Sequence, residues 1–173
     1  MLIKMFFISP LFIISSFAFS RGSIDFRYMG YVFKIPDKPA IIASEGRKDN
    51  FVNFQYGKAG SNKFLSFINV DSEPLIQELD KRTDCDYQVF LNDVFNQNKN
   101  SSCDEKELST FYNVMLHDTD YGEWSASGID VYYIIGEKKS FLILTGEDKR
   151  NINIDTGFLS KKQLKKVVSH YVQ

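Results

Sequence analysis

The stretch that most constrains the fold is an apolar hairpin pattern between Ile129 and Gly146. It reads IDVYYIIG, then EKKS, then FLILTG, so two runs rich in β-branched and aromatic residues flank a short polar segment. This pattern predicts a β-hairpin. The first run is apolar on both faces, and the second has no polar residue between Phe141 and Leu144. Strands of this kind are usually covered on both sides, so we expect the hairpin to lie inside a sheet.

Other strands are predicted where short apolar runs end at turn residues. They fall at residues 26–35, 40–44, 51–56, 64–70 and 110–116. The first four follow one another directly and predict an antiparallel meander. Residues 117–122 are expected to form a turn, and residues 96–107 and 147–157 are expected to form polar loops.

Helical periodicity is predicted in three places. One helix begins at Ser72, which can act as its N-cap, and a second begins near Asp84. The second carries an apolar stripe at helical spacing, namely Tyr87, Phe90, Leu91, Val94 and Phe95. We expect that stripe to pack on the sheet; a membrane-surface or partner helix is the alternative. The third begins at Ser160, which forms a capping-box pattern with Gln163.

The last helix has two different sides. Leu164, Val167, Val168 and Tyr171 line one side, and Lys161, Lys162, Lys165 and Lys166 line the other. A lysine side of this kind is usually solvated, although it could contact an acidic partner or lipid head groups. Together these segments predict the α+β class, an antiparallel β-sheet with helices packed on it.

The N-terminal 20 residues have the pattern of a secretory signal peptide. Lys4 gives a positive start, residues 5–19 are largely apolar, and Ala18 and Ser20 are the small residues that a signal peptidase reads. A transmembrane anchor is the alternative, but the apolar segment is short and contains Pro10. We expect cleavage before Arg21, a periplasmic or secreted location, and no membrane-spanning segment in the mature chain.

The mature chain, residues 21–173, is expected to form one domain. A hydrophobic content of 43% is enough for a substantial core. Removal of Lys4 with the leader leaves 20 Lys and Arg against 22 Asp and Glu, a net charge of −2. That balance gives no support to nucleic-acid binding, which needs a basic surface.

The two cysteines, Cys85 and Cys103, predict one disulfide bond. An isolated pair in an exported protein is most simply oxidised. A thiol nucleophile or a pair of metal ligands is the alternative, but neither cysteine lies in a Cys-x-x-Cys motif.

Three segments together resemble the PsbP-like fold and small exported proteins of the DcrB-like type. They are the sequence GYVFKIP at residues 30–36, the predicted strand 64–70 running into the helix from Ser72, and the terminal hairpin followed by a helix. The resemblance implies an α+β fold that often serves as a binding module. It implies no active site.

The chain lacks the common catalytic motifs and gives no indication of a cofactor. It has no Gly-x-Ser-x-Gly elbow, no phosphate-binding Gly-rich loop and no His-Glu-x-x-His. His170 near a helix end suits a structural role. His117 lies close to Asp118, Asp120 and Glu123, but Gly122 occupies the place of a third oxygen ligand in a calcium loop. We therefore expect neither a metal site nor catalysis.

Residues 117–124, HDTDYGEW, are the best candidate for a binding site. Aromatic residues surrounded by charge are frequent at protein interfaces, and an acidic patch steers a basic partner. The expected partner-binding residues are Asp118, Asp120, Tyr121, Glu123 and Trp124. In the alternative, Trp124 belongs to the core and the acidic residues solvate a turn.

The function expected from these features is that of an exported, non-catalytic protein-binding protein. Its most concrete form is a periplasmic immunity-type inhibitor of a toxic effector. One alternative is an envelope maintenance or assembly factor of the PsbP-like or DcrB-like kind. Another is a small hydrolase that uses the His117 region.

Overall fold

The computed structural model describes residues 22–45, 51–70, 85–98, 100–126, 128–146 and 150–169. The predicted leader, the predicted helix from Ser72, and His170 lie outside these ranges. Among the described residues, none of the helices is long and apolar enough to cross a membrane.

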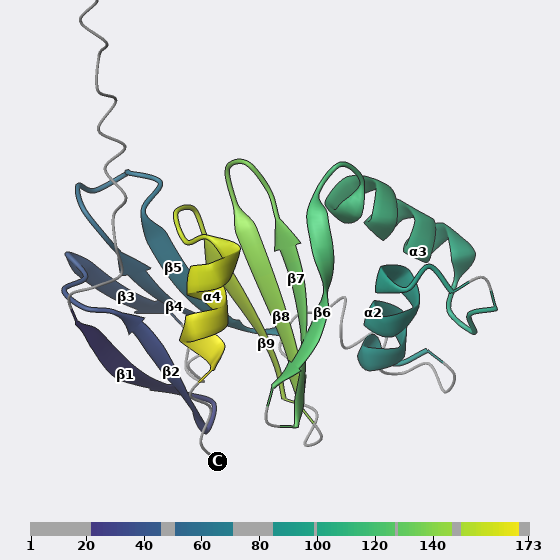
Figure 1. The fold of residues 1–173 in the computed structure, drawn as a ribbon, viewed down its shortest axis with the longest axis horizontal. Helices are drawn as coiled ribbons and strands as arrows, with labels where there is room; N and C mark the ends of the chain where they lie inside the picture. Colours follow the sequence, from purple (N-terminus) through teal and green to yellow (C-terminus); the bar gives the residue numbers. More distant parts are fainter. Residues whose placement is uncertain are drawn as a thin grey trace, which may run out of the picture.

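A seven-stranded antiparallel sheet organises the fold, with the strand order β3-β4-β5-β9-β8-β7-β6 (Figure 1). The strands are β3 (Ile41–Glu45), β4 (Phe51–Gln55), β5 (Phe64–Asn69), β6 (Asp120–Ala126), β7 (Ile129–Ile135), β8 (Ser140–Gly146) and β9 (Asn151–Thr156). A separate hairpin consists of β1 (Ser23–Tyr28) and β2 (Tyr31–Pro36). The helices are α2 (Tyr87–Phe95), α3 (Glu105–Phe111), the π-helical turn η2 (Tyr112–Leu116) and α4 (Lys161–Val168). The predicted α+β class is confirmed.

The predicted interior hairpin is confirmed as β7 and β8. They pair from Ile129 opposite Gly146 to Ile135 opposite Ser140, and other strands flank both of them. Val131 is buried on one face of β7, and Tyr132 and Ile134 are buried on the other. Burial on both faces explains why the first run has no polar side. Of the predicted four-strand meander, the part formed by β3, β4 and β5 is confirmed, whereas residues 26–35 belong to the separate β1–β2 hairpin.

The prediction of a polar loop at residues 147–157 is wrong, because β9 is the central strand. Ile152 and Ile154 are fully buried on one face, while Asn153 and Asp155 point to the other. The alternation has a period of two, as a strand requires. The polar residues on one face make this segment look like a loop in the sequence, since a central strand usually has two apolar faces.

A single strand at residues 26–35 is also a wrong prediction, because two strands meet there at a tight turn. Met29 and Gly30 both have positive φ values, 50° and 85°. Two such residues between paired strands form a turn of type I′, which glycine favours and methionine does not. Arg150 holds this turn by donating a hydrogen bond to the Met29 carbonyl, and its guanidinium lies 4.8 Å from the centre of the Tyr31 ring.

The predictions between residues 96 and 122 are wrong in three places. The expected loop ends early because the Asp104 carboxylate accepts hydrogen bonds from the amides of Lys106 and Glu107 and caps α3. The expected strand at residues 110–116 is the end of α3 followed by η2. The expected turn at 117–122 contains the start of β6 at Asp120.

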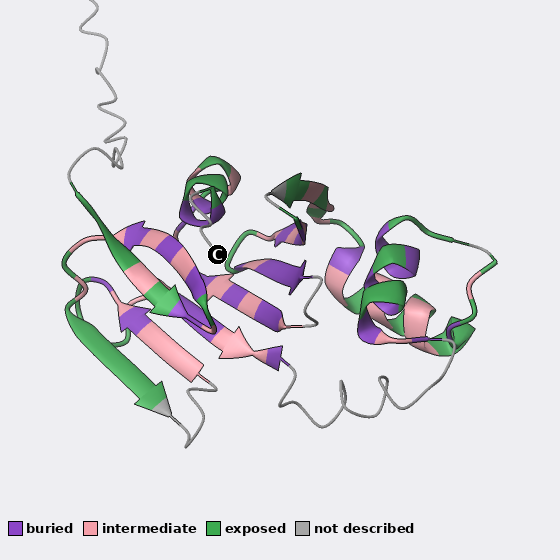
Figure 2. Ribbon diagram, turned by 90° about the horizontal axis from the view of Figure 1, so that it is seen from below, coloured by how far each residue is buried: buried purple, intermediate pink, exposed green. Residues whose placement is uncertain are grey.

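Two apolar clusters lie on opposite faces of the sheet. On one face, the β1–β2 hairpin and α4 pack against the sheet to form the front cluster, whose fully buried members include Phe33, Phe67, Ile154 and Leu164 (Figure 1). On the other face, α2, α3 and η2 cover only the strands near β6 (Figure 2). The stripe on α2 is buried there as predicted, and the capping box of α4 is present.

Polar residues occupy the second face where it crosses β4, β5, β8 and β9. Its members are Asn53, Ser66, Thr145, Asn151, Asn153 and Asp155. The Ser66 hydroxyl donates to Asn53 Oδ1 at 2.9 Å. Within the described chain, Asn153 Oδ1 and Asp155 Oδ1 are buried without a hydrogen-bond partner. Burial raises the pKa of Asp155, although Lys139 and the Asn153 amide act in the opposite direction. The two buried oxygens without a partner, on Asn153 and Asp155, therefore lower the free energy of unfolding.

We predict that Ile154→Ala lowers the free energy of unfolding by about 2–5 kcal/mol, because it removes fully buried methyl groups from the front cluster. Ile42→Ala is the matched control, since Ile42 is 60% exposed at the sheet edge and should change stability by about 0.5 kcal/mol or less. Urea unfolding measures both values. Equal losses for the two variants would contradict the central position of β9.

We predict that Asp155→Asn stabilises the protein at pH 7. Because the folded-state pKa of Asp155 is raised, the folded protein binds more protons than the unfolded chain between the unfolded and folded pKa values. The free energy of unfolding of the wild type therefore falls as pH rises through that window. Urea unfolding should show that the gain from Asp155→Asn shrinks toward pH 4. The exposed Glu137→Gln variant, in the turn between β7 and β8, serves as the control, and a pH-independent gain from Asp155→Asn would contradict the explanation.

Candidate functional site

The helical end comprises α2, α3, η2 and the segments that connect them, from Cys85 to Asp118. It stands at the β6 end of the sheet (Figures 1 and 2). Leu91, Phe95 and Leu116 belong to the buried cluster that joins it to Tyr132 and Ile134 of β7. The outer side of these helices therefore does not contact the sheet. The packing of their inner side against β7 fixes the position of the helical end.

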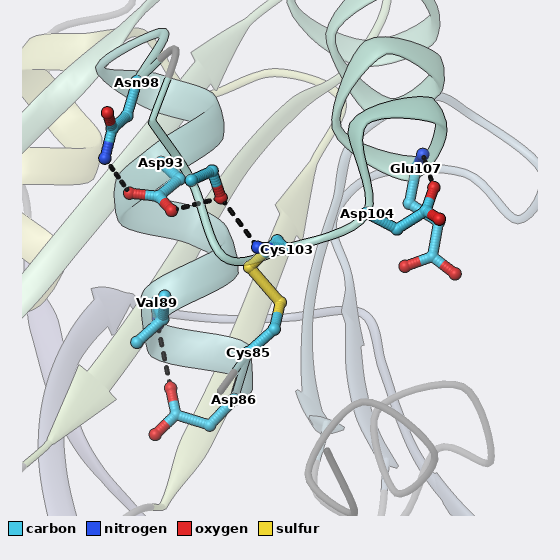
Figure 3. The surroundings of a disulfide bond; sticks show 9 residues. Cys85, Asp86, Val89, Asp93, Asn98, Cys103, Asp104 and Glu107 are labelled. Atoms are coloured by element: carbon cyan, nitrogen blue, oxygen red, sulfur yellow. Dashed lines mark hydrogen bonds between the residues drawn. A yellow bond between two sulfur atoms is a disulfide. The ribbon is translucent and has the colours of Figure 1, made fainter. Parts of the chain in front are cut away.

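A disulfide bond closes the helical end on itself (Figure 3). The sulfur atoms of Cys85 and Cys103 are 2.05 Å apart, as predicted from the sequence. The bond ties the start of α2 to the segment that enters α3. The Asp86 carboxylate next to it caps α2 by accepting a hydrogen bond from the Val89 amide at 2.8 Å.

The buried Asp93 fixes the loop between α2 and α3. Its carboxylate accepts hydrogen bonds from Asn98 Nδ2 at 2.9 Å and from Ser101 Oγ at 2.5 Å (Figure 3). The Ser101 hydroxyl in turn accepts a hydrogen bond from the Cys103 amide at 2.9 Å. Hydrogen bonds to a charged group are stronger than those between neutral groups. The loop is thus held by a carboxylate at one point and by a disulfide at another.

An open hollow of about 540 Å³ lies between α2, this loop and α3. Its polar lining residues include Asp93, Gln97, Asn98, Ser101, Glu105 and Tyr112. Val94 and Leu108 add apolar surface. Because the loop is fixed, the hollow is formed before any ligand binds, and such preorganisation reduces the entropy cost of binding.

A pair of tyrosines continues from the hollow toward β6. The rings of Tyr112 and Tyr121 are perpendicular, with centres 6.2 Å apart, and Gln97 Nε2 donates to the Tyr121 hydroxyl at 2.8 Å. The hydrogen bond with Tyr121 is the main cause that raises the pKa of Tyr112. The raised pKa keeps the Tyr112 hydroxyl neutral at physiological pH, so this hydroxyl can both donate and accept hydrogen bonds.

The π-helical turn η2 brings Tyr112 into this position. The His117 amide donates to the Tyr112 carbonyl at 2.8 Å, five residues back, which defines the wider turn. Such turns are frequent at functional sites. The same turn leaves Val114 73% exposed on the outside of the helical end.

The predicted site residues do not form one patch, because β6 divides them between two faces. Tyr121 and Glu123 point to the side of the helical end, whereas Asp120 and Trp124 point to the opposite face. Asp120 pairs there with Lys161 at 3.1 Å. Trp124 is partly buried against the front cluster, so it has both core and surface character.

Asp118 stays exposed at the helical end and lies 3.0 Å from His117 Nδ1. The described ranges contain no group of three His, Cys, Asp or Glu residues that could hold a metal ion. Residues 85–118 nevertheless contain six Asp and Glu against two Lys. The helical end is therefore acidic and would attract a basic partner.

Asp93, Gln97 and Tyr112 were not predicted as site residues from the sequence pattern. An aspartate inside an apolar helical stripe is a signal that could have indicated Asp93, since a buried carboxylate needs nearby donors. Tyr112 falls in a predicted strand, and Gln97 falls in a predicted polar loop.

Comparison with known proteins finds no matching family model, no matching curated protein and no matching solved structure.

We predict that removal of both cysteines, by Cys85→Ala with Cys103→Ala, lowers the free energy of unfolding by about 3 kcal/mol, the value that the loop length gives in the chain-entropy model. Urea unfolding under non-reducing conditions measures the loss. Thiol titration of the denatured wild type should find no free thiol, and two free thiols would contradict the disulfide.

Proposed function

We propose that this chain is an exported, non-catalytic protein-binding protein and that the helical end is its contact surface. Its most concrete form is a periplasmic immunity-type inhibitor that blocks a toxic effector. The observation that carries the proposal is the preformed hollow, whose loop is fixed by the disulfide and by Asp93. The predicted leader and the disulfide both suit an oxidising compartment outside the cytoplasm.

The surface around the hollow has the composition of a protein contact. Tyr112 and Tyr121 are large and amphipathic, and tyrosine is enriched among the residues that dominate binding energy. Val114 adds an exposed apolar side chain elsewhere on the same π-helical turn as Tyr112. The acidic balance of residues 85–118 would accelerate encounter with a basic partner, and the effect would weaken with salt.

The disulfide and the hydrogen bonds of Asp93 hold the helical end in one conformation, which suits an inhibitor. An inhibitor that blocks an enzyme gains affinity when its contact surface is already ordered, because little conformational entropy is lost on binding. The carboxylate of Asp93 orders the loop through Asn98 and Ser101, and the Gln97 amide orders Tyr121 in the same way.

We predict that Val114→Asp and Tyr112→Ala each weaken partner binding by about 2 kcal/mol or more, roughly 30-fold, if these residues dominate the contact. Tagged residues 21–173 would be used to capture proteins from the source cell, with mass spectrometry as the readout. The expected result is one stoichiometric protein that both variants lose.

Ile42→Asp is the control, because Ile42 is exposed on the sheet edge farthest from the helical end. It should retain the captured protein. Circular dichroism establishes that all variants fold. A partner that is retained by Val114→Asp and Tyr112→Ala would show that the helical end is not the contact surface. Many weak envelope partners would favour a maintenance factor instead.

A further inference from the structure

Helix α4 lies on the front face of the sheet (Figure 1), and its lysine side chains reach Tyr133 of β7 and Trp124 of β6 to form a second surface on this face. It is formed by Trp124, Tyr133 and the lysines of α4, and we name it the lysine–tryptophan surface. The centres of the two aromatic rings are 5.3 Å apart. Trp124 is the only tryptophan in the chain.

Two lysine ammonium groups are positioned over these rings. Lys161 Nζ lies 3.8 Å from the centre of the Tyr133 ring, and Lys165 Nζ lies 4.9 Å from the centre of the Trp124 ring. Both distances are within the range of cation–π attraction. The two lysines are one helical turn apart, so the rings hold two positive charges side by side.

Gly122 makes room for this arrangement. A Cβ atom built at Gly122 would lie 2.6 Å from the Tyr133 hydroxyl. Because glycine has no side chain, the Tyr133 ring can lie across β6, where it supports Lys161. Lys161 is held from the other side by Asp120, whose carboxylate oxygens are 3.1 and 3.2 Å away.

The surface carries an excess of positive charge. Residues 157–169 contain four lysines and neither Asp nor Glu. Within the described chain, Lys161 is the only one of the four with a carboxylate partner. Lys162, Lys165 and Lys166 are exposed. An anionic ligand can therefore form ion pairs here without displacing an existing one.

We propose that the lysine–tryptophan surface binds an acidic segment of a protein, with carboxylates paired to Lys162, Lys165 and Lys166 and an apolar portion of the segment against Trp124. The charge of the surface selects a carboxylate-rich ligand, and the half-buried indole offers the aromatic anchor common at protein contacts. The cation–π contacts reduce the side-chain freedom that Lys165 would lose on binding.

One feature favours a protein segment over a lipid surface. Leu164, Val167 and Val168, the apolar side of α4, are buried in the front cluster, so the helix has no apolar side to insert into a lipid surface.

Fluorescence of Trp124 gives a direct test with residues 21–173. The probe is a glutamate-rich peptide without aromatic residues, and the same peptide with Gln for Glu is the reference. We expect a saturable change in emission with the acidic peptide only. Lys162→Gln combined with Lys165→Gln should weaken binding about tenfold, the effect of losing two exposed ion pairs. Lys58→Gln, in the turn after β4, and Val114→Asp should bind as the wild type does.

Several results would overturn the proposal. They are the absence of a saturable change, equal binding of the Gln peptide, and an equal loss in Lys58→Gln. A change caused by anionic phospholipid vesicles but not by the peptide would assign the surface to lipid instead. If the double variant does not fold, Lys166→Gln and Trp124→Phe, followed by calorimetry, replace it, and unchanged affinity in both would contradict the site. Because Val114→Asp removes only the proposed helical-end contact, the two proposals can fail separately.

Discussion

The pairing of β9 with both β5 and β8 is the interaction on which the rest of the structure depends. It joins the meander of β3, β4 and β5 to the hairpin of β7 and β8, with Leu65 opposite Thr156 and Leu144 opposite Ile152. Without β9, the sheet would divide into two three-stranded sheets, β3-β4-β5 and β8-β7-β6. The front cluster spans both parts, so its burial is cooperative with this pairing.

The position of β9 also explains why the two faces of the sheet differ. Its isoleucines complete the front cluster, whereas Asn153 and Asp155 bring polar groups to the middle of the other face. On that face the described helices cover the sheet only toward β6, where Tyr132, Ile134 and Ile143 are apolar. Burial of apolar residues on the front face therefore stabilises most of the fold, and the part of the other face near β6 and β7 supports the helical end.

Much of the fold could be predicted from the sequence where one physical requirement determined the residue pattern. The hairpin at Ile129–Gly146 was predictable because burial on both faces excludes polar residues, and α4 was predictable because its cap and lysine spacing are local. β9 was not, since its polar face is explained only by neighbours distant in the chain. The turn at Met29 depends on a clamp from Arg150, which is equally distant.

The same distinction applies to the candidate site. Tyr121 was predicted as a binding residue because an aromatic among acidic residues is a local signal. Its neighbours Gln97 and Tyr112 come from segments whose position depends on the cap at Asp104 and on the wider turn at η2. The disulfide was predictable from the count of cysteines, but the role of Asp93 required the three-dimensional arrangement of Asn98 and Ser101.

Strand β6 separates two proposed surfaces of opposite charge, and the positive charge of one of them comes from the lysines of α4. Because side chains alternate along a strand, Tyr121 and Glu123 join the acidic helical end, while Asp120 and Trp124 join the lysine–tryptophan surface. A ligand that contacted both Tyr121 and Trp124 would have to pass around the edge of the sheet, since β6 is its last strand. Each surface therefore fits a different ligand, a basic one at the helical end and an acidic one at α4, and electrostatic steering would keep the two from exchanging places.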